Sequence, residues 1–343
     1  DTSQRGCELQ PPTDTTDCYY SAVEAHNLAE KYQLPVTIIS DLLLSEHPET
    51  IEADALRNDV AIERGEIVDK LPEGKGQFKR YAFTKSGISP RALPGTEGGM
   101  YVAATDDHDE EGVTISDVFT VPPVRRKIQE KRMHKVDAVL KELAPPELEG
   151  PPDADVTLIG WGSTKGVIRE AIVFLTRQGI SVNHLHVKYL HPFHSKEVNE
   201  ILRNSKRTIC VECNYTGQFA RHLRAETGFS VNDLILKYDG EPFEPHHIVE
   251  QVRAILEGQP RSLDVTMDEA REIAYHYVRV HLADKMRPAK IESLNGDDGE
   301  PLWAVEVVGR ESGEKEGELR VGKETGSIYS WRPVVLSAGA GAD

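Results

Sequence analysis

The segment from Asp155 to Gly166 constrains the fold of this chain more than any other. An apolar run over residues 156–160 enters the turn Gly160-Trp-Gly-Ser-Thr-Lys-Gly166, and a helical pattern then continues to Gln178. A buried strand that enters a helix through glycines is typical of a parallel α/β unit. The pattern repeats, with strands expected at 180–187, 207–213 and 234–238 and helices at 219–226 and 246–257. We therefore predict a doubly wound α/β domain over residues 153–258.

The N-terminal region contains part of a second α/β domain. A helix is expected over about 19–32, with Asp17 as its cap, followed by a β-branched strand over 34–41. Helix and strand at this spacing form half of a doubly wound domain, so the other half is expected upstream. The chain begins with Asp1 and not with Met, and we expect its N-terminal part to be missing.

Three further segments differ in composition from these α/β regions. Residues 42–117 are irregular and rich in proline, glycine and acids, as functional or partner-docked segments often are, and we group 1–117 together. A basic helix and a proline-rich linker occupy 118–152. One helix followed by three or four strands predicts a small α+β module over 265–333. The small-residue tail, 334–343, is expected to be disordered.

Charge and cysteine content exclude several classes of function. The net charge of −17 argues against nucleic acid or an anionic membrane surface as a partner, because both are polyanions. No apolar run reaches the roughly 20 residues that a membrane-spanning helix needs. The 4 cysteines do not form a disulfide framework in a chain of 343 residues, and this indicates a cytoplasmic protein.

The glycine turn is the best candidate for a binding site. Backbone N–H groups at the start of the following helix, with Lys165 beside them, could hold an anion, so Gly162, Ser163, Thr164 and Lys165 are candidate cofactor-binding residues. The alternative, which general frequencies favour, is a tight turn that needs glycine only for its backbone geometry. The spacing differs from that of a P-loop.

Other polar clusters are interpreted as structural. Cys210 and Cys213 lie three positions apart in a predicted strand and so face opposite sides, which suits buried or edge thiols better than one metal. The histidine pairs 184/186, 191/194 and 246/247 lack the spacing of a zinc site, and a packing or solvated role is preferred. We predict no metal ligand. The basic stretch 125–135 could bind phosphates, but we favour its offsetting the acidic stretch 106–111.

An ordered series of segments covers roughly residues 15–257. Its members are residues 24–41, Ser86-Gly-Ile-Ser-Pro-Arg-Ala-Leu-Pro-Gly95, residues 107–112 and 125–135, the turn 160–166, residues 186–193, and Val211-Glu-Cys-Asn-Tyr-Thr-Gly-Gln-Phe-Ala-Arg221. In this order the segments resemble the alpha subunits of 2-oxoacid:ferredoxin oxidoreductases. The resemblance implies a partial thiamine-diphosphate pyrimidine-type domain followed by a transketolase-C-like domain. The tail resembles a PepSY-like module.

What the resemblance implies is oxidative decarboxylation of a 2-oxoacid, most closely 2-oxoglutarate, to succinyl-CoA with reduction of ferredoxin. The complex would use thiamine diphosphate and magnesium, with iron–sulfur clusters on a partner beta subunit that ferredoxin approaches. Coenzyme A and the 2-oxoacid are the implied substrates. The family's Tyr-Pro-Ile-Thr-Pro and Gly-Pro-Ser-Thr-Gly stretches do not occur here, so no catalytic residue is assigned. The isolated chain is predicted to be inactive and to supply scaffold and subunit contacts.

Two other functions stay open from the sequence. A transketolase-like or E1-type thiamine enzyme component would share the two-domain arrangement, although the Gly-Ile-Ser-Pro-Arg and Asn-Tyr-Thr-Gly-Gln segments favour the ferredoxin-linked family. A non-catalytic regulatory or binding protein would explain the absence of the two active-site stretches and the added C-terminal module. Sequence encoded upstream of Asp1 would separate these readings.

Overall fold

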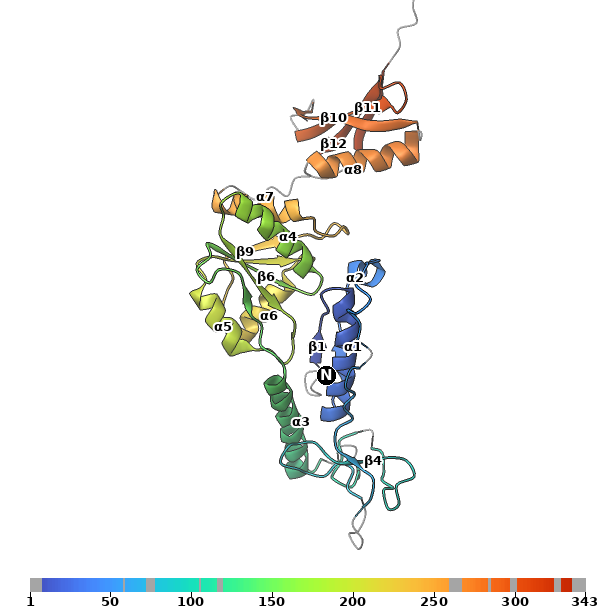
Figure 1. The fold of residues 1–343 in the computed structure, drawn as a ribbon, viewed down its shortest axis with the longest axis vertical. Helices are drawn as coiled ribbons and strands as arrows, with labels where there is room; N and C mark the ends of the chain where they lie inside the picture. The colour runs from blue at the N-terminus through green and yellow to red at the C-terminus, as the bar shows by residue number, and fades with distance from the viewer. Residues whose placement is uncertain are drawn as a thin grey trace, which may run out of the picture. The chain divides into compact units, whose positions relative to one another are not determined.

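A five-stranded sheet forms the centre of the predicted α/β domain (Figure 1). All neighbouring strands pair in parallel except the first along the chain, which is antiparallel to its neighbour at the edge of the sheet. In spatial order the strands are β5 (Leu148–Glu149), β7 (Val182–Val187), β6 (Val156–Trp161), β8 (Thr208–Glu212) and β9 (Asp233–Leu236). Every residue of β7 and β8 is buried, which explains why these strands read as continuous runs in the sequence.

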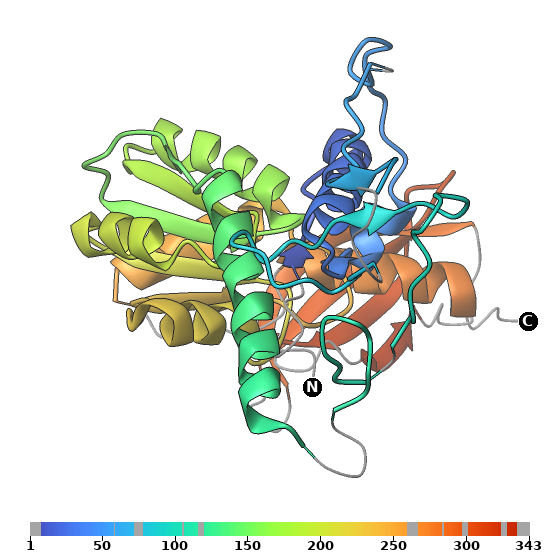
Figure 2. The same ribbon diagram turned by 90° about the horizontal axis from the view of Figure 1, so that it is seen from below.

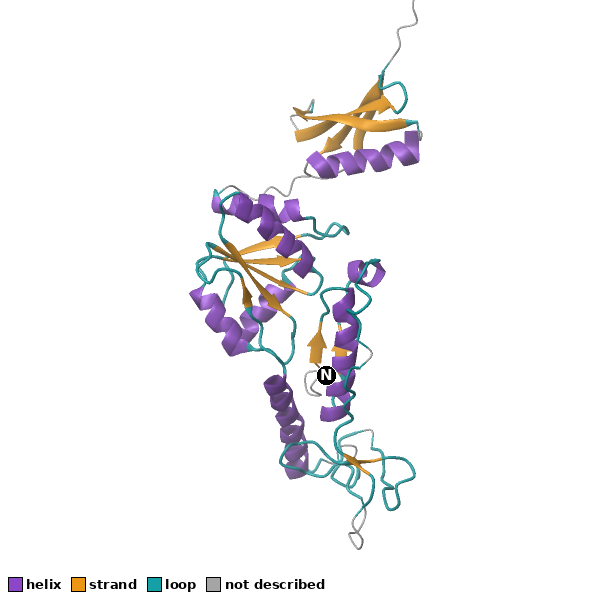
Figure 3. Cartoon of the chain, in the orientation of Figure 1, coloured by secondary structure: helices purple, strands orange, loops and turns teal. Residues whose placement is uncertain are grey.

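Helices cover both faces of this sheet. One face carries α4 (Thr164–Arg177) and α7 (Pro245–Leu256), whose apolar side chains share one core cluster. The other carries α5 (Ser195–Asn204) and α6 (Gln218–Thr227), as Figure 3 shows. These two helices share a second core cluster. The predicted doubly wound α/β class is confirmed. The sequence analysis missed α5 and β5.

The computed structural model describes residues 8–57, 59–71, 78–104, 106–115, 120–258, 267–282, 285–296, 301–323 and 328–334. The chain divides into two units, Asp1–Gly258 and Gln259–Asp343, and each is described by itself. Among the described residues, no helix is both long and apolar enough to cross a membrane. The predicted linker residues 259–261 and the tail beyond residue 334 lie outside the described part.

The N-terminal region packs around two long helices. Leu28 and Tyr32 of the first helix share a core cluster with Val139 of the second and with Tyr189, and Figure 2 shows the second as one unbroken helix. The elements are β1 (Glu8–Gln10), α1 (Thr15–Tyr32), β2 (Val36–Ile38), α2 (Leu42–Glu46), β3 (Ile67–Val68), β4 (Arg91–Ala92) and α3 (Pro122–Glu142).

The cap of α1 differs from the prediction. Asp14, not Asp17, caps the helix, and its carboxylate accepts a 2.8 Å hydrogen bond from the backbone N–H of Asp17. Asp17 is already inside the first turn, where its side chain is free to contact Lys188. The prediction was wrong because two aspartates three residues apart both suit a helix start, and the local sequence does not choose between them.

The second unit is a helix packed on a small antiparallel sheet. Helix α8 (Met267–Tyr277) continues into the π-helical turn η2 (Val278–Leu282), and its buried Ala270 and Ala274 face the sheet. The strands follow in chain order: β10 (Met286–Asn295), β11 (Pro301–Gly309), β12 (Lys315–Gly322) and β13 (Ile328–Pro333). One helix and four strands agree with the predicted α+β module, and its likeness to PepSY modules stays a prediction.

Candidate functional site

Two glycines at the end of β6 are required, Gly160 by packing and Gly162 by its backbone conformation. A Cβ atom added to Gly160 would lie 2.5 Å from Cδ1 of Ile168 and 2.7 Å from Oγ1 of Thr164. Gly162 has a φ of +57°, a conformation that side-chain-bearing residues rarely adopt. The Thr164 hydroxyl closes the turn, since it donates to the carbonyl of Trp161 at 2.8 Å and accepts from the N–H of the same residue at 3.2 Å.

The other two candidate residues face different parts of the molecule. The hydroxyl of Ser163 donates to a carboxylate oxygen of Asp41. The other carboxylate oxygen of Asp41 accepts from the N–H of Leu44 at 2.9 Å and caps α2. A carboxylate of the N-terminal region therefore lies at the turn where an anion was predicted. Lys165 instead lines a cavity. Binding of a cofactor anion at Gly162, Ser163, Thr164 and Lys165 stays a prediction.

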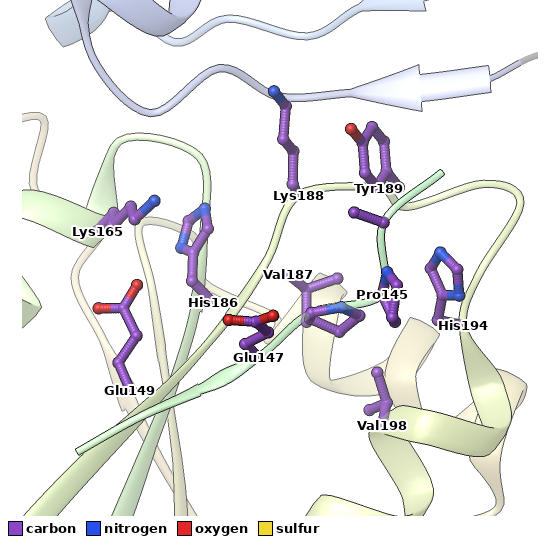
Figure 4. Close-up of a pocket in the computed structure, with 12 residues that line it drawn as sticks. Pro145, Glu147, Glu149, Lys165, His186, Val187, Lys188, Tyr189, His194 and Val198 are labelled. Atoms are coloured by element: carbon purple, nitrogen blue, oxygen red, sulfur yellow. The ribbon is translucent and has the colours of Figure 1, made fainter. Parts of the chain in front are cut away.

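The cavity beside Lys165 has a volume of about 210 Å³. It lies where β7 ends, between the proline-rich segment that precedes β5 and the start of α5 (Figure 4). Ligands of doubly wound domains bind outside the carboxyl ends of the parallel strands, and this cavity has that position. The residues that line it and carry a charged or polar group are Glu147, Glu149, Lys165, His186, Lys188, Tyr189 and His194.

Two buried histidines, His184 and His186, lie in β7, and His186 lines the cavity. His184 and His186 have no hydrogen-bond partner on either ring nitrogen among the described residues. Burial lowers the pKa of His184 to about 4, although the charge of Glu149 opposes the shift. Burial also holds the pKa of His186 well below its usual range. Both rings are therefore neutral near pH 7, and His186 can donate or accept one hydrogen bond toward a ligand in the cavity.

Lys188 joins the cavity to the N-terminal region. Its amine lies 2.9 Å from a carboxylate oxygen of Asp17 and 3.5 Å from one of Glu24. The adjacent Tyr189 hydroxyl donates to Glu24 at 2.7 Å. Burial acts to raise the pKa of Asp17, but hydrogen bonds and the charge of Lys188 outweigh it and the pKa is lowered. These contacts fix α1 against the end of β7.

The two cysteines of the Cys-x-x-Cys segment lie in different surroundings. Cys210 is fully buried in β8, whereas Cys213 is exposed beyond its end. Although Cys213 is exposed as a whole residue, protein atoms around its sulfur partly desolvate it and, with the charge of Asp41, raise the pKa of the thiol to about 11, so it is a thiol and not a thiolate at neutral pH. Among the described residues, no group of three or more His, Cys, Asp and Glu side chains could hold a metal ion.

Glu212, which was not predicted as a site residue, ends β8 and is fully buried. Its carboxylate accepts hydrogen bonds from the backbone N–H groups of Phe219 at 2.7 Å and Ala220 at 2.9 Å, and from the amide of Asn214 at 2.7 Å. The charge thus lies at the N-terminus of α6, where N–H groups and the helix dipole stabilise it. The sequence contained one weak signal for this contact. The residue before α6 is Gly217, which has no side chain to cap the helix, so another acceptor is needed there.

Comparison with known proteins gives a consistent family assignment. The family model described as "Pyruvate:ferredoxin oxidoreductase core domain II" matches residues 154–248. The alpha subunit of 2-oxoacid:ferredoxin oxidoreductase 2 from Aeropyrum pernix is 33% identical over 249 residues, which are 71% of this chain and 37% of the relative. A Mycobacterium tuberculosis protein named 2-oxoglutarate oxidoreductase subunit KorA is 29% identical over 263 residues, which are 74% of this chain and 37% of the relative.

One solved structure agrees with these relatives. It is a 2-oxoglutarate:ferredoxin oxidoreductase from Magnetococcus marinus with 2-oxoglutarate, coenzyme A and succinyl-CoA bound. It is 32% identical and has a TM-score of 0.62, and the matched region is 72% of this chain and 42% of the chain in that structure. The chain spans well under half the length of these relatives. The ordered motifs, the doubly wound domain and these similarities show that the chain belongs to the family of 2-oxoacid:ferredoxin oxidoreductase alpha subunits.

Proposed function

We propose that this chain acts within the alpha subunit of an enzyme that decarboxylates 2-oxoglutarate oxidatively to succinyl-CoA and passes the electrons to ferredoxin. The observation that carries the proposal is the likeness to the Magnetococcus marinus enzyme, at a TM-score of 0.62 over 72% of this chain. The relative named as a 2-oxoglutarate oxidoreductase subunit supports the same choice of 2-oxoacid. Pyruvate and other 2-oxoacids are the alternative substrates that the test must include.

The proposed role of this chain is to form a scaffold and to contact other subunits. The contacts that join its parts support this role: Ser163 with Asp41, and Lys188 with Asp17 and Glu24. Glu212 is fully buried and bound to four donors of its own domain, one of them the Cys210 thiol, so it is a structural carboxylate. No described residue is assigned to thiamine diphosphate or to magnesium.

Thiamine diphosphate would supply the reaction with its carbanion-stabilising chemistry. We place its diphosphate and magnesium, together with the iron–sulfur clusters, on a partner beta subunit. The complex would work in the cytoplasm. The acidic net charge of this chain, −17, also favours docking of an acidic ferredoxin on the beta subunit, since like charges oppose association.

An anaerobic dye-reduction assay tests the function. This chain, and the same chain with its upstream sequence restored, are each mixed with the beta subunit, thiamine diphosphate, magnesium, coenzyme A and a viologen dye. We expect 2-oxoglutarate to drive dye reduction only in the mixture with the restored sequence. Reduction by residues 1–343 with the beta subunit would overturn the scaffold role, and no reduction with any 2-oxoacid in either mixture would overturn the proposed function.

A further inference from the structure

A second cavity lies against α3, away from the sheet of the α/β domain. It has a volume of about 190 Å³, enough for a polyatomic group, since a single water needs only about 10–15 Å³. Four basic side chains line it: Arg80 from the irregular segment, and Lys131, Arg132 and Lys135 from α3. No Asp or Glu is among the described residues that line it.

The carboxylates near this cavity neutralise only part of its positive charge. Asp107 pairs with Arg125 and lies 3.1 Å from Arg132, which confirms that the basic helix offsets the acidic stretch there. Glu110 pairs with Lys79 at 3.5 Å and accepts from the N–H of Phe83. In the described part of the chain, no carboxylate lies within ion-pair distance of Arg80, Lys131 or Lys135.

The contacts of these three cations leave donors available. Lys131 donates to the carbonyl of Tyr81 at 2.8 Å and to the hydroxyl of Ser89 at 2.6 Å. Lys135 donates to the carbonyl of Gln33 at 3.1 Å, and Arg80 donates to the side-chain oxygen of the same residue at 2.9 Å. An ammonium has three donors and a guanidinium five, so N–H groups remain for a ligand.

Burial makes this arrangement costly without an anion. Lys135 is only 7% exposed. Burial first, and then the positive charges of Arg80 and Arg132, lower its pKa to about 8. Burial and the neighbouring cations, Lys135 foremost, lower the pKa of Lys131 to about 8, although Glu110 opposes the shift. Lys131 also lies 5.8 Å from the centre of the Phe83 ring, and Arg80 lies 5.6 Å from that of Tyr81 and 6.0 Å from that of Tyr101. These cation–π contacts bring no net negative charge, so the buried positive charge still favours an anion.

We infer that the cavity between residues 80–89 and α3 is a binding site for a phosphate group, held by Arg80, Lys131 and Lys135. A phosphate dianion has oxygens for several donors, and its two negative charges offset most of the positive charge of the three cations. The site is separate from the cavity beside His186 and independent of the proposed oxidoreductase activity. The phosphate could be the free ion or the terminal group of a nucleotide-like ligand.

Titration calorimetry on the full chain tests this site. The probes are inorganic phosphate and adenosine monophosphate, each in buffer with chloride at matched ionic strength. We expect saturable binding to the wild type and to a Lys141→Met control, which removes an exposed cation from the same helix. Lys135→Met should weaken binding at least about tenfold, because it removes a buried charge within contact distance of the anion.

A second variant protects the test against misfolding. Arg80→Met removes a partly exposed charge and should weaken binding in the same way with an unchanged circular dichroism spectrum. Tighter binding of adenosine monophosphate would identify a phosphate carried by a larger ligand, and equal binding would identify the free ion. No saturable binding of either probe by the wild type, or affinities unchanged in both Lys135→Met and Arg80→Met, would overturn the inference.

Discussion

Replacement of Glu212 by glutamine tests how the family-like segment after β8 is held. The carboxylate accepts three hydrogen bonds from N–H groups at 2.7–2.9 Å and a fourth from the Cys210 thiol at 3.6 Å, and an amide of the same shape can replace only one of its two oxygens. If the amide oxygen keeps the hydrogen bonds from Phe219 and Asn214, the new NH₂ group faces the N–H of Ala220. Two hydrogen-bond donors then point at each other in a buried site.

The expected cost follows from these contacts. A buried donor that loses a charged acceptor costs about 2–3 kcal/mol. For a unit of this size that lowers the melting temperature by about 4–12 °C. If α6 opens locally, exchange of the Phe219 and Ala220 amides should accelerate about 30- to 140-fold. Glu226→Gln, an exposed change on the same helix, is the control and should stay within about 0.5 kcal/mol of wild type.

Urea unfolding followed by circular dichroism measures the loss of stability. Hydrogen exchange followed by NMR or mass spectrometry measures the exchange rates of the two amides. The reasoning is refuted if Glu212→Gln unfolds like the Glu226→Gln control and the amides of Phe219 and Ala220 exchange at the wild-type rate.

Three further outcomes are expected. The folded-state pKa of His184, about 4, is below its unfolded value of about 6.5, so the stability that the neutral ring contributes is lost as pH falls from 6.5 toward 4. This loss amounts to about 2 kcal/mol at pH 5. His184→Leu should therefore show less acid destabilisation than the wild type in urea titrations at pH 5 and 7.5. Ser163→Ala should cost about 1 kcal/mol in the same titration at pH 7.5, and an unchanged midpoint would show that its bond to Asp41 contributes nothing. Limited proteolysis should cut between Gly258 and Met267 and leave two resistant pieces; a chain that stays intact, or degrades throughout, would contradict two separately folded units.

The sequence was most informative where local pattern and burial agree. The strand that enters a helix at residues 156–166 has an apolar run and paired glycines, so both its type and its position could be predicted. Helix α5 was missed because Ser195–Asn204 is only 10 residues long, although Val198, Ile201 and Leu202 have the i, i+3, i+4 spacing of an amphipathic helix. Strand β5 has only two residues, and its pairing with β7 depends on tertiary structure.

The site was less predictable for the same physical reason. Lys165 was found because it lies in a recognisable turn, but Glu149 and His186, which line the same cavity, come from strands β5 and β7. Glu212 caps a helix that begins six residues later, a contact that no local capping pattern describes. The pairing of Asp41 with Ser163 joins residues 122 positions apart. Such contacts follow from the packed fold and not from spacing.

The central claim is that this chain belongs to a working 2-oxoglutarate-oxidising alpha subunit. The most direct measurement is mass spectrometry of the acyl-CoA formed when the complete alpha chain and the beta subunit are incubated anaerobically with 2-oxoglutarate, pyruvate, coenzyme A, thiamine diphosphate, magnesium and ferredoxin. We expect succinyl-CoA, formed together with reduced ferredoxin and abolished when coenzyme A or the beta subunit is left out. Acetyl-CoA as the main product would contradict the choice of 2-oxoglutarate, and the absence of any acyl-CoA would contradict the activity itself.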